Sequence, residues 1–328
     1  MTNMDFEVMG GASTVHSKVS LTTSARLHMG FFDLNGNLGR RFGSIGLSLQ
    51  NPVTSLTVTQ ADKTSANGPI SERAMDVALK IQQAFGLSGV HIEMQNAIPE
   101  HSGLGSGTQL SLAVGMAINY LFGLDLSVAK IAALTERGMR SGVGLGTFLH
   151  GGLIVDGGRA KDSVVPPVIA KAHFPESWPI LLIFDEAHQG VHGAEEIAAF
   201  KALPVFSAES SAMLCRHVLM QALPAIAERD LKSFGRAIQA LQAVTGDYFA
   251  PAQGGARYTS RRVAQALLML QQNGVDCFGQ SSWGPTGFAV FENQVQAETQ
   301  LQQLRAKFDD LRFELTQANN QPSQFVIS

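Results

Sequence analysis

The sequence is poor in cysteine, in charge and in long apolar runs, and each shortage excludes a class of protein. Two cysteines, Cys215 and Cys277, are too few for a disulfide framework and do not have the spacing of a metal site. Charged residues make up 16% of the chain and the net charge is −3, so no basic field favours nucleic acid. The apolar run near 179–184 is far shorter than the ~20 residues that span a bilayer. We expect a soluble, cytoplasmic protein.

The 328 residues are 45% hydrophobic, which is enough for a substantial core in one large domain or two ordinary ones. Residues 1–17 lack the basic start of a secretory signal, so we expect a flexible tail there. Four prolines between positions 166 and 179 mark a boundary, which predicts domains at 18–165 and 166–328. Strands and helices mix without a strict strand–helix–strand rhythm, which predicts an α+β fold.

The stretch IPEHSGLGSGTQL, residues 98–110, combines an apolar strand, a glycine-rich turn and an apolar helix. Val90, Ile92 and Met94 alternate with polar residues, as in a half-buried strand, and a helix is predicted over 109–122. Glycines let a backbone approach an anion, and the N–H groups of the first helical turn point at it. The turn contains no lysine, so it is not a Walker A loop. It is either a phosphate site or a tight connection that needs small residues. The candidate diphosphate-binding residues are Ser102, Gly103, Leu104, Gly105, Ser106, Gly107 and Thr108.

The segment from Pro99 to Ser106 resembles the phosphate loop of the family that includes galactokinase, homoserine kinase and mevalonate kinase. This resemblance, which covers the whole chain, implies two α+β domains with the active site between them. It also implies that Mg²⁺ supplies the positive charge the loop lacks, held by Ser106 and by Glu136. Glu136 can equally be a solvated charge at the end of a helix.

Two family motifs are altered in this chain. Kinases of the mevalonate type carry a Ser-Gly-x-Asp segment whose aspartate assists the acceptor hydroxyl, and here Ser141 and Gly142 are followed by Gly144 in that place. A glycine has no side chain with which to accept a proton. The third motif reads GQSSWGPTG, residues 279–287, and its Trp283 can either stack on a planar ligand or lie buried in an ordinary turn. We therefore do not expect ATP-dependent phosphorylation.

Three segments together resemble one branch of this superfamily, the β-ribofuranosylaminobenzene 5'-phosphate synthase family of tetrahydromethanopterin biosynthesis. They are RLHMGFFD (26–33), GLGSGTQLSLAVG (103–115) and the GQSSWGPTG turn. The resemblance implies that phosphoribosyl pyrophosphate condenses with 4-aminobenzoate or 4-hydroxybenzoate, with loss of carbon dioxide and pyrophosphate, to form a C-riboside. This reaction needs a diphosphate holder but no phosphoryl acceptor, and a homodimer is the family-level expectation.

The first of these segments supplies three candidate catalytic residues. Arg26 can grip a carboxylate or phosphate in bidentate fashion, His28 can move a proton, and Asp33 can bind Mg²⁺ or ribose hydroxyls. The alternative is that Arg26 and Asp33 form an ordinary ion pair and that His28 is a core residue. His188, with the nearby His192, is a candidate beside the aromatic substrate, and the spacing of the two also permits zinc. The candidate residues for binding the aromatic substrate are Ser281, Ser282 and Trp283.

Two other functions stay open at this point. The chain can be an ATP-dependent small-molecule kinase, which the glycine at position 144 disfavours. It can also be a non-catalytic sensor of a phosphorylated metabolite, which would bind its ligand without turnover.

Overall fold

The computed structural model describes residues 16–188, 202–282 and 284–328. The first part of the chain forms β1 (Lys18–Asp33), β2 (Arg40–Arg41), β3 (Gly43–Gln60), β4 (Ser65–Asn67), α1 (Ser71–Phe85), β5 (Val90–Asn96), α2 (Ser106–Phe122), α3 (Val128–Leu134), α4 (Val143–His150), β6 (Leu153–Asp156), β7 (Arg159–Ala160) and β8 (Val168–Ala172). The second part forms β9 (Ile180–Phe184), α6 (Ala208–His217), a π-helical turn (Val218–Ala222), α7 (Leu223–Glu228), α8 (Leu231–Phe249), a 3₁₀ turn (Ala250–Gln253), α9 (Arg261–Gln272), β10 (Cys277–Gln280), β11 (Gly287–Val290), α10 (Gln294–Lys307), β12 (Arg312–Thr316) and β13 (Gln324–Ile327).

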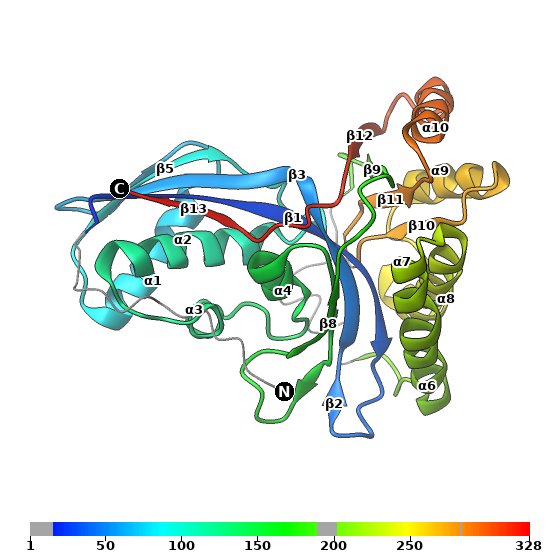
Figure 1. Ribbon diagram of the computed structural model, residues 1–328, viewed down its shortest axis with the longest axis horizontal. Helices are drawn as coiled ribbons and strands as arrows, with labels where there is room; N and C mark the ends of the chain where they lie inside the picture. The colour runs from blue at the N-terminus through cyan, green and yellow to red at the C-terminus, as the bar shows by residue number, and fades with distance from the viewer. Residues whose placement is uncertain (1–15, 189–201, 283) are drawn as a thin grey trace.

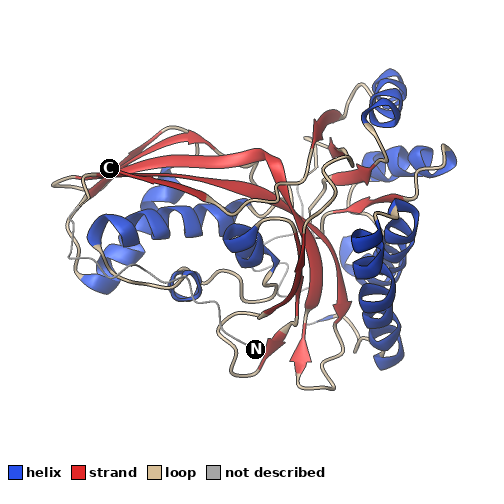
Figure 2. Ribbon diagram, in the orientation of Figure 1, coloured by secondary structure: helices blue, strands red, loops and turns tan. Residues whose placement is uncertain are grey.

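A seven-stranded sheet forms the long axis of the molecule (Figure 1). Its strands run in the order β13-β1-β3-β5-β4, and β6 pairs with both β3 and β8. A four-stranded antiparallel sheet, in the order β10-β11-β9-β12, lies near the other end of the molecule. Figure 2 shows the helices in two groups; the first lies against the seven-stranded sheet, and the second contacts both the long strands of that sheet and the four-stranded sheet. The predicted α+β fold is confirmed.

The first group of helices packs on the sheet because its apolar residues lie on the faces that meet. Val58, Ile92 and Met94 point from β3 and β5 into a core with Leu112 and Ile118 of α2. Each such side chain contributes about 1.5–3 kcal/mol when fully buried. This packing holds the start of α2 at a fixed place beside the sheet.

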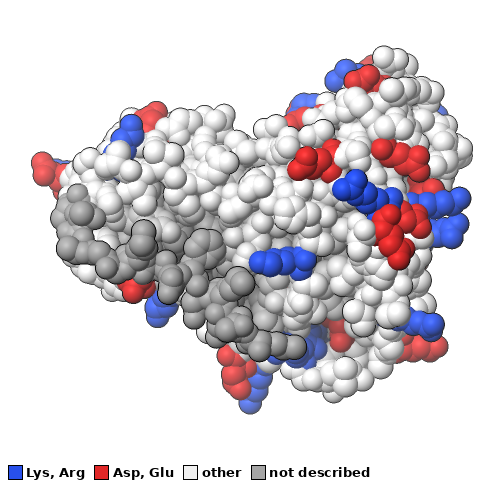
Figure 3. Space-filling model, viewed as in Figure 1, with Lys and Arg blue, Asp and Glu red and all other residues white. Residues whose placement is uncertain are grey.

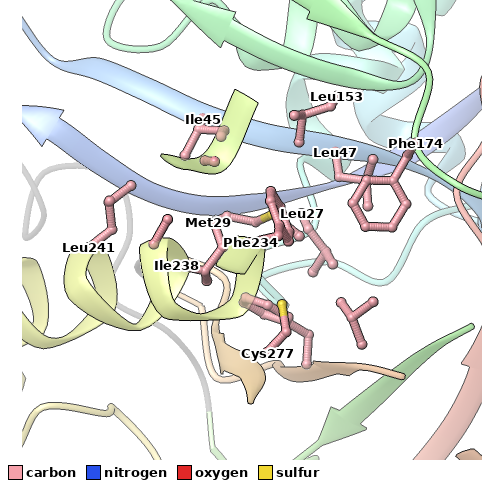
Figure 4. Packing of buried hydrophobic residues seen from close by; sticks show 14 of the residues in the cluster. Leu27, Met29, Ile45, Leu47, Leu153, Phe174, Phe234, Ile238, Leu241 and Cys277 are labelled. Atoms are coloured by element: carbon pink, nitrogen blue, oxygen red, sulfur yellow. The ribbon is translucent and has the colours of Figure 1, made fainter. Parts of the chain in front are cut away.

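A second core joins the two parts of the chain. Leu27 and Met29 of β1 and Leu47 of β3 pack against Phe234 and Ile238 of α8 (Figure 4). The C-terminal half of β1 and the N-terminal half of β3 therefore pack against the second group of helices. A third core lies between the small sheet and the helices α9 and α10. The middle of β1, between the two groups of helices, is where both parts meet.

Two of the strands beyond the predicted domain boundary join the first sheet. β8, which begins at Val168, pairs with β6, and β13 pairs with β1, whereas β9 to β12 form the second sheet. The division into 18–165 and 166–328 stays a prediction. Most of the predicted tail, together with His192 and Trp283, lies outside the described residues.

No helix in the described ranges is long and apolar enough to cross a membrane. On the face drawn in Figure 3, acidic and basic side chains are interspersed rather than gathered by sign, in keeping with the net charge of −3. Binding of an anion therefore depends on local geometry.

Candidate active site

The glycine-rich loop between β5 and α2 takes left-handed conformations that few residues adopt. The φ angles of Gly103 and Gly105 are 80° and 81°, and Gly105 is the N-cap of α2. The carbonyl of Gly105 accepts hydrogen bonds from the N–H groups of Thr108 (3.1 Å) and Gln109 (3.0 Å). Helix geometry leaves the first N–H groups, those of Ser106 and Gly107, without an intrahelical acceptor. The loop thus has the backbone arrangement of an anion site.

The turn between β10 and β11 lies directly on this loop. A Cβ placed on Gly103 would lie 2.6 Å from the Cα atom of Gly284, so only glycine allows the two backbones to come so close. The Ser281 hydroxyl donates to the Gly103 carbonyl at 2.7 Å, and Nη1 of Arg26 donates to the same oxygen at 2.7 Å. The structure therefore brings together three segments that the sequence analysis treated separately.

His28 lies at the centre of this contact and is only 3% exposed. Its Nδ1 atom is 2.8 Å from the Ser282 hydroxyl, its N–H donates to Ser281 at 3.1 Å, and its carbonyl accepts from the Ser282 N–H at 3.1 Å. Within the described part of the chain, Nε2 is buried without a hydrogen-bond partner. Burial lowers the pKa of His28 well below its usual range, and the charge of Arg26 lowers it further. The imidazole is therefore neutral at pH 7.

Asp33 does not join this group. It lies seven residues beyond Arg26 on the same strand, roughly 20 Å away at the rise of a β-strand. Its carboxylate accepts the N–H of Asn35 at 3.0 Å. This separation excludes the ion pair between Arg26 and Asp33 that the sequence left open.

His188 follows β9, at the end of the small sheet that carries the Ser281–Thr286 turn. Gly287 of β11 lies opposite Ile183 of β9, which places the residues after β9 level with that turn. The N–H of His188 is 3.3 Å from the carbonyl of Asp185. His188 thus follows the end of β9 on the side of the small sheet that carries this turn, and its role in the site stays a prediction.

The two predicted metal ligands lie at the start of α2 and after α3. Ser106 is the first residue of the helix, and Glu136 follows α3 with φ 57°. The Glu136 carboxylate is 3.9 Å from Nζ of Lys80, and its side chain is 79% exposed. No group of three His, Cys, Asp or Glu residues that could hold a metal occurs among the described residues. A metal here would depend on oxygen atoms supplied by its ligand.

The position that corresponds to the kinase aspartate, Gly144, has little space for a side chain. Gly144 is buried in α4, and a Cβ there would lie 3.1 Å from Cγ2 of Thr108. Its carbonyl accepts from the side-chain amide of Gln109 at 2.9 Å, and the other end of that amide accepts from the hydroxyl of Thr23 at 2.6 Å. A larger residue at position 144 would press on the start of α2.

The N-terminus of α4 is bound by a carboxylate that the sequence analysis missed. Asp156 accepts hydrogen bonds from the Ser141 hydroxyl (3.1 Å), the Gly142 N–H (3.0 Å), the Gly158 N–H (2.8 Å) and the Ser44 hydroxyl. Burial raises the pKa of Asp156 to about 6, against the lowering effect of these hydrogen bonds. An aspartate after the apolar residues LIV gives no sequence signal that separates this role from an ordinary strand end.

Two arginines beside the phosphate loop were also missed. Nη2 of Arg73 and Cζ of Arg137 lie 3.2 and 3.3 Å from the point where a Cβ of Gly107 would be. Arg137 directly follows Glu136, but the motif comparison singled out only the acidic neighbour. Their proximity to the loop depends on the packing of α1 and α3, which no local pattern reports.

Comparisons with known proteins agree with this geometry. The family model "GHMP kinases N terminal domain" matches residues 72–152, and "GHMP kinases C terminal" matches residues 222–310. A homoserine kinase from Cytophaga hutchinsonii has a similar structure, with a TM-score of 0.65 and 18% identity over 96% of this chain and 99% of that chain. A mevalonate diphosphate decarboxylase from Staphylococcus aureus has a TM-score of 0.66 at 13% identity, over 94% of this chain and 98% of that chain. At these identities the likeness shows the fold alone.

The curated relatives are more specific. The β-ribofuranosylphenol 5'-phosphate synthase of Archaeoglobus fulgidus is 34% identical over 287 residues, which is 83% of this chain and 88% of that protein. The protein of the same name from Methanocaldococcus jannaschii is 33% identical over 252 residues, covering 68% of this chain and 76% of that protein. The chain therefore belongs to the β-ribofuranosylphenol 5'-phosphate synthase family, within the GHMP kinase superfamily.

Proposed function

We propose that this protein joins phosphoribosyl pyrophosphate to a 4-substituted benzoate and releases carbon dioxide and pyrophosphate. The similarity to the synthases along most of the chain carries this proposal. The acid is 4-hydroxybenzoate rather than 4-aminobenzoate, since these relatives are named for a ribofuranosylphenol. The product is a C-riboside 5'-phosphate for tetrahydromethanopterin biosynthesis.

The reaction breaks two bonds and forms one. The ring carbon that bears the carboxylate attacks C1 of the ribose, and the bond from C1 to the diphosphate oxygen breaks. The electron pair of the bond to the carboxylate then returns to the ring as carbon dioxide leaves. This step needs no strong base, so orientation of the two substrates can supply much of the acceleration, about 7–11 kcal/mol.

The glycine-rich loop has the role of binding the leaving diphosphate. Negative charge grows on that group as C1 separates from it, and the N–H groups of Ser106 and Gly107 lie at the helix end that stabilises such charge. The hydroxyl groups of Ser106 and Thr108 add donors. The Ser102 hydroxyl donates instead to the Pro99 carbonyl at 2.7 Å, so Ser102 shapes the loop.

Mg²⁺ is the proposed cofactor, and the residues present fit it. Ser106 offers a hydroxyl oxygen at the loop, and Glu136 offers a carboxylate whose exposed side chain is free to turn. Mg²⁺ usually takes one or two protein oxygens together with substrate phosphates and water. When bound, it would neutralise charge on the diphosphate.

The benzoate has its proposed place beside the Ser281–Thr286 turn, in contact with Ser282; the predicted contact with Trp283 falls outside the described residues. Arg26 positions the loop through its hydrogen bond to the Gly103 carbonyl. Its positive charge has the further role of attracting the carboxylate of the benzoate. His28 has the role of a neutral hydrogen-bonding group and His188 that of a second proton carrier. A catalytic role for Asp33 stays a prediction that the distance along β1 does not support.

The decisive experiment incubates the pure protein with Mg²⁺, phosphoribosyl pyrophosphate and carboxyl-labelled benzoates. We expect labelled carbon dioxide and pyrophosphate in equal amounts from 4-hydroxybenzoate. Absence of labelled carbon dioxide with both the hydroxy and the amino acid contradicts the proposal. In the same assay Ser106→Ala should lower turnover much more than the melting temperature, because this hydroxyl is not part of a core.

A kinase is the second candidate, favoured by the match of residues 72–152 and 222–310 to the two GHMP kinase family models. The closed position of Gly144 argues against it. Release of ADP across a panel of small acceptors would support a kinase. Tight ligand binding with neither ADP nor carbon dioxide released would instead support a sensor. We further propose a cytoplasmic homodimer, which light scattering on the purified protein can test.

A further inference from the structure

A cavity of about 360 Å³ lies beside the second turn of α2, at Leu110 and Ser111, between α1, α2 and the segment after α3. Three cationic side chains and one acidic side chain line it, so its wall carries a net positive charge although the whole chain has a net charge of −3. The lining residues used below are Arg73, Asp76, Lys80, Thr135 and Arg137. Neither the family models nor the curated names assign a role to this cavity.

Arg73 presents the two arms of its guanidinium to different partners. Nη1 binds the carboxylate of Glu100, which belongs to the glycine-rich loop. Nη2 lies 3.2 Å from the Cβ position of Gly107, at the start of α2. The ion pair with Glu100 therefore holds Arg73 beside the helix end that faces the proposed diphosphate.

Arg137 approaches the same point from the other side. Its Cζ and Nη1 atoms each lie 3.3 Å from the Cβ position of Gly107, so the two guanidinium groups are close neighbours. Burial lowers the pKa of Arg137, and the charge of Arg73 lowers it further. In residues 16–188, 202–282 and 284–328, Arg137 forms no ion pair.

The nearby carboxylates offset the charge of this pair only in part. Glu100 pairs with Arg73. The charge of Glu136 raises the pKa of Arg137, but the Glu136 side chain is 79% exposed and its carboxylate lies 3.9 Å from Nζ of Lys80. Asp76 is a third carboxylate in the cavity wall. Two guanidinium groups at the positive end of a helix repel each other, and a multivalent anion would relieve that repulsion.

We infer that Arg73 and Arg137 bind the oxygen atoms of a diphosphate together with the start of α2. They supply the positive charge that a lysine supplies in other phosphate loops. The small size of Gly107 is what lets both guanidinium groups reach the helix end. This inference rests on the proposed function only in identifying the anion as the pyrophosphate end of the sugar substrate.

Calorimetric titration of the full-length protein with sodium pyrophosphate tests the pair, once in EDTA and once with Mg²⁺. We expect binding in both conditions, with Arg73→Gln and Arg137→Gln each raising Kd at least tenfold in EDTA. The slope of log Kd against log salt concentration should fall in both variants. Arg305→Gln, which removes an exposed charge from α10, should leave Kd within twofold, and melting curves verify that each variant is folded.

The outcomes separate this inference from the proposed function. An unchanged Kd for Arg137→Gln overturns the inference, even if labelled carbon dioxide is released by the wild type. A wild type that does not bind pyrophosphate overturns it as well. A raised Kd in a protein that releases no carbon dioxide supports the pair and contradicts the proposed reaction.

Discussion

The helices α2 and α4 have similar N-terminal sequences, but side chains of opposite charge lie next to their N-termini. Both follow glycine-rich segments, and both have a glycine as N-cap, Gly105 in α2 and Gly142 in α4, so the N-cap residue has no side chain that could accept a hydrogen bond. Each start therefore presents N–H groups and a partial positive charge. What differs is the residue that comes to meet it.

At α4 the partner is part of the protein. The buried carboxylate of Asp156 accepts the Gly142 N–H at 3.0 Å and three further hydrogen bonds, so this helix end is closed. At α2 the neighbours are the cations Arg73 and Arg137. A glycine-rich segment before a helix thus does not by itself specify a ligand site, because an internal anion can satisfy the same groups.

The largest expected effect follows from removing the internal anion. Asp156→Ala leaves two buried N–H groups and two hydroxyl groups without their acceptor, which should cost about 3 kcal/mol or more of unfolding free energy. Urea denaturation measures the loss. The exposed Asp162→Ala serves as the control and should leave the midpoint unchanged. A midpoint for Asp156→Ala equal to that of the wild type would mean that α4 does not need its carboxylate.

The local parts of this comparison could be predicted from the sequence. Alternation at Val90, Ile92 and Met94 predicted the strand, and the apolar run after Gln109 predicted the helix and its end at Phe122, but the helix begins three residues earlier, at Ser106. The family resemblance implied only that the active site lies between two domains, and the contact of the loop with the Ser281–Thr286 turn was not predicted. The predicted features depend on neighbours in sequence.

The partners of the two helix ends could not be predicted. Arg73 and Arg137 are 64 positions apart and reach Gly107 only after α1 and α3 have packed beside α2. Asp156 ends an apolar strand, and nothing in LIVD indicates that its carboxylate points to Gly142. Charged side chains carry no periodicity, so their pairing is decided by tertiary packing.

A smaller effect should appear in the pH dependence of stability. His28 is neutral when folded because its pKa is lowered by burial and by Arg26, whereas in the unfolded chain it titrates near pH 6.5. As the pH falls below about 6.5, only the unfolded state takes up the proton, so the folded protein loses stability by up to ~1.4 kcal/mol per pH unit. His28→Asn lacks this loss.

Urea denaturation of both proteins between pH 7.5 and 5.5 measures the difference. Asp156 titrates with a pKa of about 6 and gives the opposite slope, but it is present in both proteins and cancels. The wild type should therefore lose its advantage over His28→Asn as the pH falls. A stability difference between the two proteins that is constant, or that grows in favour of the wild type toward pH 5.5, would contradict a neutral His28 in the folded protein.

The smallest effect on stability, and the sharpest on the comparison, is expected for Gly107→Ala. Alanine favours a helix by up to about 1 kcal/mol over glycine, so the melting temperature should stay level or rise. The new methyl group would lie 3.2–3.3 Å from the guanidinium groups of Arg73 and Arg137 and push them away from the helix end. The Kd for pyrophosphate should then rise several-fold in a protein that is at least as stable.

Gly123→Ala, at the other end of α2, is the matched control. A Cβ at this position meets nothing within 4 Å. Because Gly123 has a φ of 59°, the substitution should lower stability but leave the Kd for pyrophosphate unchanged. If Gly107→Ala kept the wild-type Kd, the open end of α2 would not depend on its arginines, and the contrast with the closed end of α4 would lose its physical basis.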